Sequence, residues 1–341
     1  MDSFTIAMTI FAFILGWLVK KASERFLDRT VGQHIDVVAN TVVDKWLEPA
    51  FKSMKNYLMN NTSKEVEAKA RIGYPEAQFT LGAMFLFGES VKQNKIEAVK
   101  WLKKAAEQGY ALAQHNLAII YYNGDSLIKP DKKEAFKWCR MAAEQGIAYS
   151  QHGIALMYYK GEGVQQNYSE AFKWWSIASA LGNTEAQYNL GLMYYKGQGV
   201  KQDYYEAVRC FRKAADSGDA KAQYNIAIMY YKGQEVRQDD SEAVRWYRKA
   251  AEQGLADAQI NLGFMYEYGK GVTQDYSEAF KWYSKAAEQG NVYAQYNLGC
   301  LYENGRGVEH NHLEAVKWCR MAAEQGLVEA QKWLSVFGED N

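Results

Sequence analysis

Hydrophobic and small residues recur along most of the chain at helical spacing, in short stretches separated by glycine-containing loops. Residues 183–218 show the pattern in full. Its first stripe consists of Ala186, Leu190, Met193 and Tyr194, and its second of Ala207, Phe211, Ala214 and Ala215. Spacings of three and four place such side chains on one face of a helix. The pattern therefore predicts two amphipathic helices, ended by Gly197 and Gly218.

The same pattern is repeated along the chain. An alanine–glutamine or serine–glutamine pair marks each unit, and the glutamines stand at positions 78, 114, 151, 187, 223, 259, 295 and 331. Neighbouring glutamines are 36 residues apart except for one interval of 37, whose extra residue lies in the loop 125–132. Neither helix can bury its apolar face alone, so the hairpins must stack. We therefore predict an all-α fold, an α-solenoid of seven helix–loop–helix repeats plus a closing half-repeat over residues 73–337, with a tail at 338–341.

The repeat resembles a known family. The sequence AQYNLGLMY from Ala186, the loop GQGV from Gly197, and the KAAEQG ending of several second helices are similar to the Sel-one-like repeat (SLR), a relative of the tetratricopeptide repeat. The resemblance covers Tyr74 to about Phe337 and implies a non-catalytic adaptor that holds other proteins. Ser90 and Glu235 stand where other loops have a second glycine, so we expect those two loops to differ in shape.

The N-terminal residues 1–20 are strongly apolar. Phe4 to Val19 carries no charge, and sixteen helical residues span about 24 Å of a hydrocarbon layer of about 30 Å. Lys20, Lys21, Arg25 and Arg29 follow this segment, which places the repeats in the cytoplasm by the positive-inside rule. We predict a single-pass inner (plasma) membrane anchor, with periplasmic repeats as the alternative. A cleaved signal peptide and a soluble apolar helix are the other interpretations.

Residues 21–72 are predicted to form amphipathic connecting helices. The apolar stripe of the first runs from Leu27 to Trp46, with Val31, Ile35, Val38 and Val42 between. This stripe can cap the open end of the repeat stack, mediate self-association, or lie on the membrane surface.

Composition narrows the function. The chain has 341 residues, 48% of them hydrophobic, with 40 basic and 40 acidic side chains, so no charge excess favours nucleic acid as a partner.

Candidate reactive residues are few. The cysteines Cys139, Cys210, Cys300 and Cys319 lie far apart, and Cys139 and Cys319 share one local sequence, which indicates core positions. His310 and His312 lack a third ligand and are interpreted as solvated loop residues. No nucleophile motif or nucleotide fingerprint occurs, so we expect no enzyme activity, cofactor, metal or small-molecule substrate.

The resemblance to tetratricopeptide repeats implies that the first helices line a concave groove. The proposed partner-binding residues are Tyr188, Asn189, Leu192, Tyr195, Lys196, Lys221, Tyr224, Asn225, Ile228, Asn261, Tyr296 and Asn297. In related repeats the asparagine binds a peptide backbone, but here it can equally bond the neighbouring repeat. The tyrosines can likewise serve binding or packing. Only Lys221 has the spacing to its asparagine that a carboxylate clamp needs, so recognition of a C-terminal carboxylate is not predicted.

Together these observations predict a membrane-anchored scaffold or adaptor in a bacterial cell. Its partner is a protein or an extended peptide bound on the concave surface. The alternative prediction is a specific inhibitor or immunity protein that neutralises a toxin or effector enzyme.

Overall fold

The computed structural model describes residues 47–124 and 127–337, and its regular elements there are helices. The chain divides into two compact units, unit 1 ending at Asn183 and unit 2 beginning at Thr184. Unit 1 contains a helix over residues 47–59, then α3 (Ser63–Arg71), α4 (Pro75–Phe87), α5 (Lys95–Glu107), α6 (Ala111–Asn123), α7 (Lys132–Glu144), α8 (Ala148–Lys160) and α9 (Tyr168–Ala180). Unit 2 contains α10 (Thr184–Lys196), α11 (Tyr204–Asp216), α12 (Ala220–Lys232), α13 (Asp240–Glu252), α14 (Ala256–Tyr268), α15 (Tyr276–Glu288), α16 (Val292–Asn304), α17 (His312–Glu324) and α18 (Val328–Phe337).

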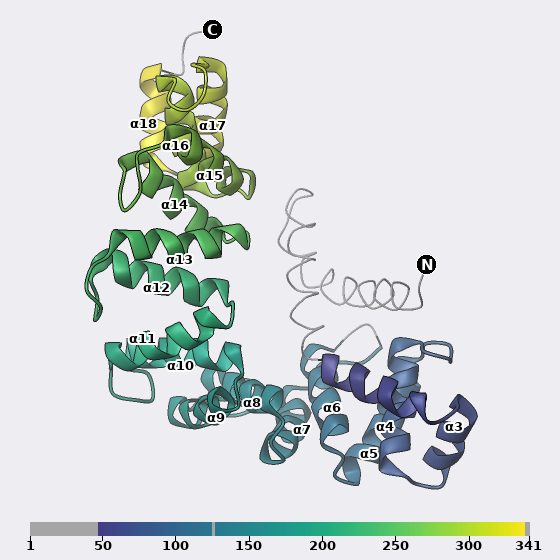
Figure 1. Cartoon of the computed structure of the whole chain (residues 1–341). Coiled ribbons are helices and arrows are strands. Elements are labelled where there is room, and N and C mark those ends of the chain that lie inside the picture. Colours follow the sequence, from purple (N-terminus) through teal and green to yellow (C-terminus); the bar gives the residue numbers. More distant parts are fainter. Residues whose placement is uncertain (1–46, 125–126, 338–341) are drawn as a thin grey trace. The chain divides into compact units, whose positions relative to one another are not determined.

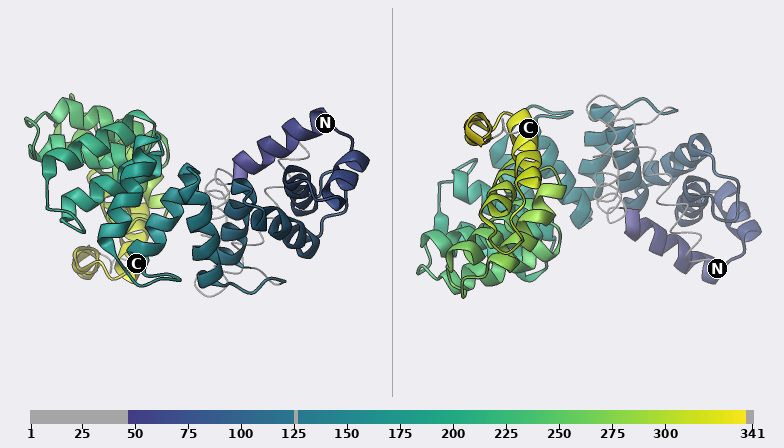
Figure 2. Two further views of the ribbon diagram at one scale, coloured as in Figure 1. Left: turned by 90° about the horizontal axis from the view of Figure 1, so that it is seen from below. Right: turned by 90° about the horizontal axis from the view of Figure 1, so that it is seen from above.

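Each repeat is a pair of packed helices, as the sequence predicts. The first helix packs against the second helix of its own repeat, and within a unit each second helix packs against the next first helix. Figure 1 shows these pairs following one another within each unit, and Figure 2 shows the same pairs from two further directions. Unit 1 thus holds three complete repeats, and unit 2 holds four repeats followed by the closing helix α18.

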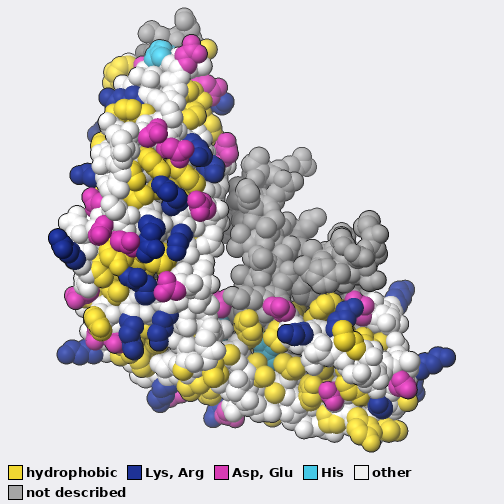
Figure 3. Space-filling model, in the orientation of Figure 1, with side chains coloured by type: hydrophobic (Ala, Val, Ile, Leu, Met, Phe, Trp, Pro, Cys, Tyr) yellow, Lys and Arg dark blue, Asp and Glu magenta, His cyan; other side chains and the backbone are white. Residues whose placement is uncertain are grey.

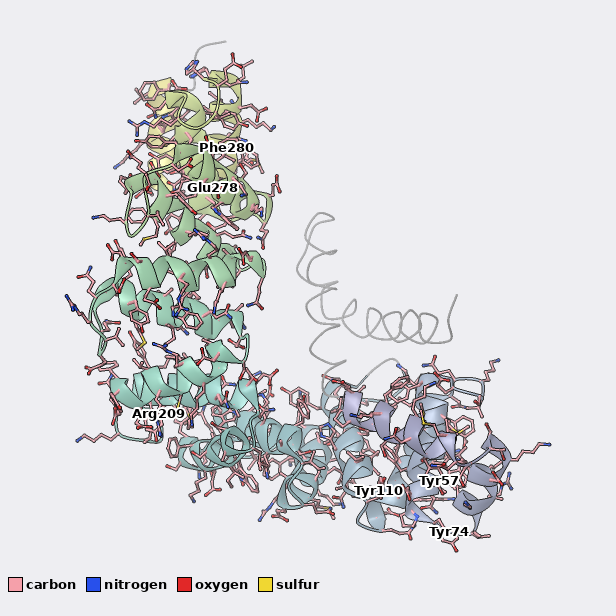
Figure 4. All side chains as sticks on the ribbon, in the orientation of Figure 1. Tyr57, Tyr74, Tyr110, Arg209, Glu278 and Phe280 are labelled. Atoms are coloured by element: carbon pink, nitrogen blue, oxygen red, sulfur yellow. The ribbon has the colours of Figure 1, made fainter. Side chains whose placement is uncertain are left out.

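The helix ends follow local capping rules. Every second helix is preceded by an Asn or Asp whose side chain accepts a hydrogen bond from a backbone N–H of the first turn, namely Asn94, Asp131, Asn167, Asp203, Asp239, Asp275 and Asn311. Glutamates in the first turn of several second helices form ion pairs one turn further on. Glu206 pairs with Arg209 at 2.6 Å, and Glu278 with Lys281 at 2.9 Å. Figure 4 labels Arg209 and Glu278 on their helices.

The predicted apolar stripes form the core. Ala186, Leu190 and Met193 of α10 are buried, as are Phe211 and the alanines of α11, while Tyr194 is half-buried. Cys139 and Cys319 are buried and free, which confirms the interpretation as core positions. Burial raises the pKa of the Cys139 thiol to about 12, so this thiol stays protonated at neutral pH.

The two loops without the second glycine keep a left-handed backbone. Ser90 has φ 60° and Glu235 has φ 55°, whereas the equivalent Gly271 has φ 65°. The expectation of a different loop shape is therefore not met at this residue. The non-glycine side chains accept a conformation that costs roughly 1–2 kcal/mol because the flanking helices fix the loop ends.

The repeated glutamines join neighbouring helices. Seven of the eight donate from Nε2 to an alanine carbonyl near the end of the preceding helix, as Gln259 does to Ala251 at 3.1 Å. In five of them Oε1 also accepts from a glutamine that follows the second helix of the same repeat, as Gln259 does from Gln289 at 2.7 Å. The acceptor bond recurs at Gln78, Gln114, Gln223 and Gln295. We call this series the glutamine ladder.

The N-terminal helices cover the first repeat. Leu47, Met54 and Val66 form one buried cluster with residues of α4 and α5, and Thr62 and Glu65 form a capping box that starts α3. Tyr57, Tyr74 and Tyr110, labelled in Figure 4, come from the 47–59 helix and the starts of α4 and α6. The first repeat therefore packs against these helices.

Two predicted segments and the tail lie outside the described residues. These are the apolar segment Phe4 to Val19, the stripe Leu27 to Trp46, and residues 338–341. Among the helices that the structure describes, none combines the length and the apolar character that a membrane crossing requires.

Candidate functional site

The predicted partner-binding residues lie on the first helices of unit 2. Tyr188, Asn189, Leu192, Tyr195 and Lys196 belong to α10, Lys221, Tyr224, Asn225 and Ile228 to α12, Asn261 to α14, and Tyr296 and Asn297 to α16. The tyrosines and asparagines are half-buried, whereas the lysines are exposed. Equivalent positions therefore recur on successive first helices of one stack.

A hollow of about 350 Å³ lies between α12 and α14. It is lined by Tyr224, Ile228, Tyr231, Lys232, Tyr247, Asn261, Phe264 and Met265. Tyr224, Ile228 and Asn261 belong to the predicted set, so the structure brings these three together. Tyr231 and Phe264, whose rings meet edge to face at 6.4 Å, are the counterparts of Tyr195 and Leu192 in other repeats. The repeat pattern of the predicted groove therefore includes them.

The asparagines bond the preceding repeat. Asn225 shares a hydrogen bond with the Tyr188 hydroxyl, and Asn261 donates from Nδ2 to the Tyr224 hydroxyl at 3.5 Å. Asn261 also bonds Tyr247. These contacts favour the interpretation that the repeated asparagine links neighbouring repeats. Asn189 donates instead to the Glu185 carbonyl of its own helix, at 2.9 Å.

Asn116 of unit 1 is the exception to this bonding. It is fully buried, and neither its Oδ1 nor its Nδ2 has a hydrogen-bond partner. The positions that correspond to Tyr224 and Tyr247 in the repeat before it are Phe79 and Leu102, which have no hydroxyl. The amide therefore lacks the partners that the tyrosines supply in unit 2.

The tyrosines of the groove also pack within their own repeats. The Tyr188 ring lies 5.7 Å from Phe211, and the Tyr224 ring lies 5.9 Å from Tyr247. Burial raises the pKa of Tyr188, Tyr224 and Tyr247, so their hydroxyls stay protonated. Tyr247, which is buried, forms the floor of the hollow, and the half-buried Tyr224, Tyr231 and Phe264 form its sides.

Charge changes along one edge of unit 2. Lys196 and Lys232 are exposed at the ends of α10 and α12. Near the ends of α14 and α16 the chain has Glu267, which accepts from the Tyr283 hydroxyl at 2.8 Å, and Glu303, whose Oε2 lies 2.7 Å from His312 Nδ1. The face of unit 2 drawn in Figure 3 shows hydrophobic side chains among both basic and acidic ones.

His312 differs from its prediction as a loop residue. It is the first residue of α17, because Asn311 caps that helix, and its ring lies 6.1 Å from Trp333. Among the residues that the structure describes, no cluster of three or more His, Cys, Asp or Glu side chains is arranged to hold a metal ion.

Unit 1 contains a second, more enclosed hollow between α6 and α8, which we call the α6–α8 pocket. Its volume is about 170 Å³. It is lined by His115, Ala118, Ile119, Tyr122, Asn123, Cys139, Tyr149, Ser150, Gly153, Leu156 and Met157. Sequence reasoning missed it, although Gly153 stands where the other complete repeats from the second onward have asparagine.

The comparisons with known proteins agree with this architecture. The sequence model of the Sel1 repeat matches seven consecutive segments, residues 75–110, 111–147, 148–183, 184–219, 220–255, 256–291 and 292–327. A protective antigen of uropathogenic Escherichia coli with an SLR fold is 35% identical, with a TM-score of 0.77 over 81% of this chain. The match spans 59% of that antigen, so this chain corresponds to only part of it.

Two further solved structures show different degrees of likeness. A Sel1 repeat protein from Oxalobacter formigenes is 31% identical, with a TM-score of 0.67 over 84% of this chain and 85% of that one. An immunity protein from Pseudomonas aeruginosa is 21% identical, with a TM-score of 0.38 over 63% of this chain and 81% of that one. The second likeness is too low to support a shared function.

Proposed function

Because the chain belongs to the Sel1 repeat family, whose members mediate protein–protein interactions, we propose that it is a scaffold that binds an extended segment of a partner protein. The proposed binding surface is the first-helix face of unit 2, which we call the unit 2 groove. It comprises the exposed side of α10, α12, α14 and α16. The proposal includes no catalytic step.

The hollow between α12 and α14 is the observation that carries this proposal. Tyr231 and Phe264 offer aromatic surface at its side, and Lys232 offers a cation at its edge. Interfaces favour aromatic anchors beside a charged rim, because the anchors lose water while the rim orients the partner. The asparagines contribute mainly by holding the groove tyrosines in place, because their amides already bond those hydroxyls.

The electrostatics suggest the partner's direction. An acidic residue of the partner would lie near Lys196 and Lys232, and a basic residue near Glu267 and Glu303. Such rim charges influence association rate and orientation more than affinity.

Binding is tested with the whole chain as bait in a crosslinking pull-down from its own cells, followed by titration of the captured partner. Tyr231→Ala and Phe264→Ala should each weaken binding by about tenfold or more, since truncation of a central aromatic anchor costs about 2 kcal/mol. Tyr205→Ala is the control, because Tyr205 is 67% exposed on a second helix. Equal affinity in all three variants would place the binding surface elsewhere, and the absence of any bound protein would refute the scaffold.

The alternative, a specific inhibitor or immunity protein, is separated by the same experiment. An inhibitor would form a one-to-one nanomolar complex with a single enzyme and abolish that enzyme's activity. A scaffold would bind its partner without inhibiting it.

We also propose that the scaffold is tethered to the inner membrane by Phe4 to Val19, with its repeats in the cytoplasm. The proposal rests on the uncharged segment and the four basic residues that follow it. Tethering would concentrate any protein bound in the unit 2 groove near the membrane.

A further inference from the structure

The α6–α8 pocket of unit 1 differs in kind from the hollow of unit 2. Its floor consists of Ala118, Cys139, Gly153 and Met157, all buried, and its mouth is formed by Tyr122, Asn123, Tyr149 and Leu156, which are half-buried or exposed. Its lining is mostly apolar and includes no Asp, Glu, Lys or Arg. Hydrophobic side chains are prominent on the face of unit 1 drawn in Figure 3.

The repeat register explains why this pocket exists. The α6–α8 pocket and the hollow between α12 and α14 occupy the same place in two different pairs of repeats. Three of the positions that differ in size between them lie at the floor or beside it, with His115 in place of Tyr224, Cys139 in place of Tyr247, and Gly153 in place of Asn261.

In unit 2 the Tyr247 ring is 2% exposed and fills the floor. In unit 1 a thiol stands in the place of that phenol, and no side chain stands in the place of the amide. The α6–α8 pocket is the smaller of the two hollows, but no aromatic ring of its own occupies the place that the Tyr247 ring takes at the floor in unit 2.

The buried polar atoms at the floor of the pocket have partners. His115 Nδ1 lies 2.7 Å from Ser150 Oγ, and the Cys139 thiol donates to the Ser150 carbonyl at 3.2 Å. At the floor an entering group therefore meets mainly carbon and sulfur, while the Asn123 amide lies at the exposed mouth. Sulfur atoms make favourable contacts with aromatic rings, and Cys139 and Met157 supply two of them.

The pocket wall is held in place before any ligand arrives. The Tyr122 hydroxyl donates to Glu162, and Lys132 Nζ lies 3.1 Å from the centre of the Tyr122 ring. A fixed wall lowers the cost of binding, because little side-chain freedom remains to be lost.

We propose that the α6–α8 pocket receives one uncharged aromatic side chain, phenylalanine or tyrosine, of the partner protein. A volume of about 170 Å³ suits a single ring, since an apolar protein cavity of about 150 Å³ binds benzene. The pocket thus gives unit 1 an anchor site separate from the unit 2 groove. The assignment of the occupant to a partner protein rests on the proposed function, whereas the pocket itself does not.

The pocket is tested directly with small probes on the whole chain. Toluene and 4-methylphenol represent the two side chains, butylammonium is the charged control, and ligand-observed NMR titration is the readout. Both aromatic probes should bind and butylammonium should not. Failure of both aromatic probes to bind would overturn the proposal.

Two variants locate the probe. The combination of His115→Tyr, Cys139→Tyr, Ser150→Ala and Gly153→Asn copies Tyr224, Tyr247, Ala258 and Asn261, and it should reduce probe affinity at least tenfold. Leu156→Ala removes part of the mouth and should reduce affinity several-fold. Leu313→Ala is its control and should change nothing, because Leu313 is 78% exposed on α17 and lines neither hollow.

If the fourfold variant does not fold, the comparison of Leu156→Ala with Leu313→Ala still decides. Equal probe affinity in these two variants would overturn the site.

Selection of displayed random peptides on the whole chain tests the protein occupant. Peptides selected by the wild type should share an aromatic residue at one position, and selection on the fourfold variant, or on Leu156→Ala, should lose that preference. Selected peptides without a fixed aromatic residue would overturn this inference while leaving the proposed function intact. If the probes bind but no peptide is selected, the proposed function is refuted. The pocket then exists, but its occupant is not a side chain of a partner protein.

Discussion

Single residues at equivalent positions of the repeat differ in ways that the fold makes measurable. Asp219 caps α12 by accepting from the Ala222 N–H at 2.7 Å, and Asn291 caps α16 through the N–H groups of Tyr293 and Ala294. Burial raises the pKa of Asp219, with the Ala222 bond opposing this shift. The cap of α12 is therefore a partly buried carboxyl that is destabilised when it is charged, whereas the equivalent cap of α16 is a neutral amide.

Asp219→Asn should raise stability at neutral pH. A carboxyl whose pKa is higher in the folded state binds its proton more tightly there, so its contribution falls as pH rises from the ordinary value of about 3.9 through the folded pKa. Asparagine keeps the cap and does not titrate. The thermal midpoint of the wild type should therefore fall relative to that of Asp219→Asn as the pH rises from about 4 to about 7. Asn291→Asp is the control, because it introduces a charge at the equivalent cap of α16. A difference in thermal midpoint between wild type and Asp219→Asn that does not change with pH would contradict this prediction.

Gly271→Ala should be more destabilising than Gly254→Ala. Both glycines have positive φ, 65° and 90°, so alanine costs roughly 1–2 kcal/mol of backbone strain at either position. A Cβ at Gly271 would also lie 2.3 Å from the Asp240 carbonyl, whereas nothing lies within 4 Å of one at Gly254. Urea unfolding should show an additional loss of about 1–3 kcal/mol for Gly271→Ala. Equal losses would mean that this loop shifts freely away from α13.

At the level of elements, the glutamine ladder connects the first helices of five repeats to the helices before and after them. In the third repeat Gln151 donates to the Ala143 carbonyl at 3.2 Å, but its buried Oε1 has no partner. Leu181 stands where five other rungs have the donor glutamine, and it is 58% exposed. The ladder is incomplete at this rung because a hydrophobic residue replaces an amide.

Leu181→Gln should complete that rung and stabilise unit 1. A new hydrogen bond to a buried, unsatisfied oxygen is worth about 1–3 kcal/mol, and an exposed leucine contributes little burial. The denaturation midpoint should rise, and amide exchange at the end of α9 should slow. Leu181→Ser removes the leucine without supplying the amide and should show neither effect. A gain of equal size in both variants would assign the stabilisation to loss of the exposed leucine.

At the scale of the whole molecule, two stacks of hairpins carry two different binding features. Unit 2 offers a half-polar groove with lysines and glutamates at its edge, and unit 1 offers a smaller apolar pocket. Repeat proteins present such surfaces because each hairpin contacts only its neighbours, so outward positions vary without loss of the core. A partner that uses both features would combine an aromatic anchor with a charged segment.

The proposed anchor is tested by membrane topology. A C-terminal reporter active only in the cytoplasm should be active, and one active only outside it should be inactive, because the basic residues follow Phe4 to Val19. The chain should remain in the membrane fraction after a carbonate wash. Replacing Lys20, Lys21, Arg25 and Arg29 with glutamine should weaken this orientation. Activity of the exported reporter alone would reverse the topology, and recovery in the soluble fraction would refute the anchor.

The sequence by itself determined the helices, their ends and their buried faces. Asn167 and Asp203 cap because their side chains reach the first turn of their own helix, and Leu190 and Phe211 are buried because the helical period places them on one face. These rules act within one repeat. They could be read without knowing how repeats meet.

Only the tertiary structure decided what the outward positions do. Asn261 bonds Tyr224 of the repeat before it, and the α6–α8 pocket opens where Cys139 and Gly153 come together from successive repeats. Of the named groove residues, three share one hollow with Tyr231 and Phe264, the counterparts of Tyr195 and Leu192. The physical reason is that these contacts depend on pairs of residues about one repeat apart. Whether such a pair forms a hydrogen bond or leaves a pocket depends on the size and polarity of both residues. The helical period of the sequence does not encode this.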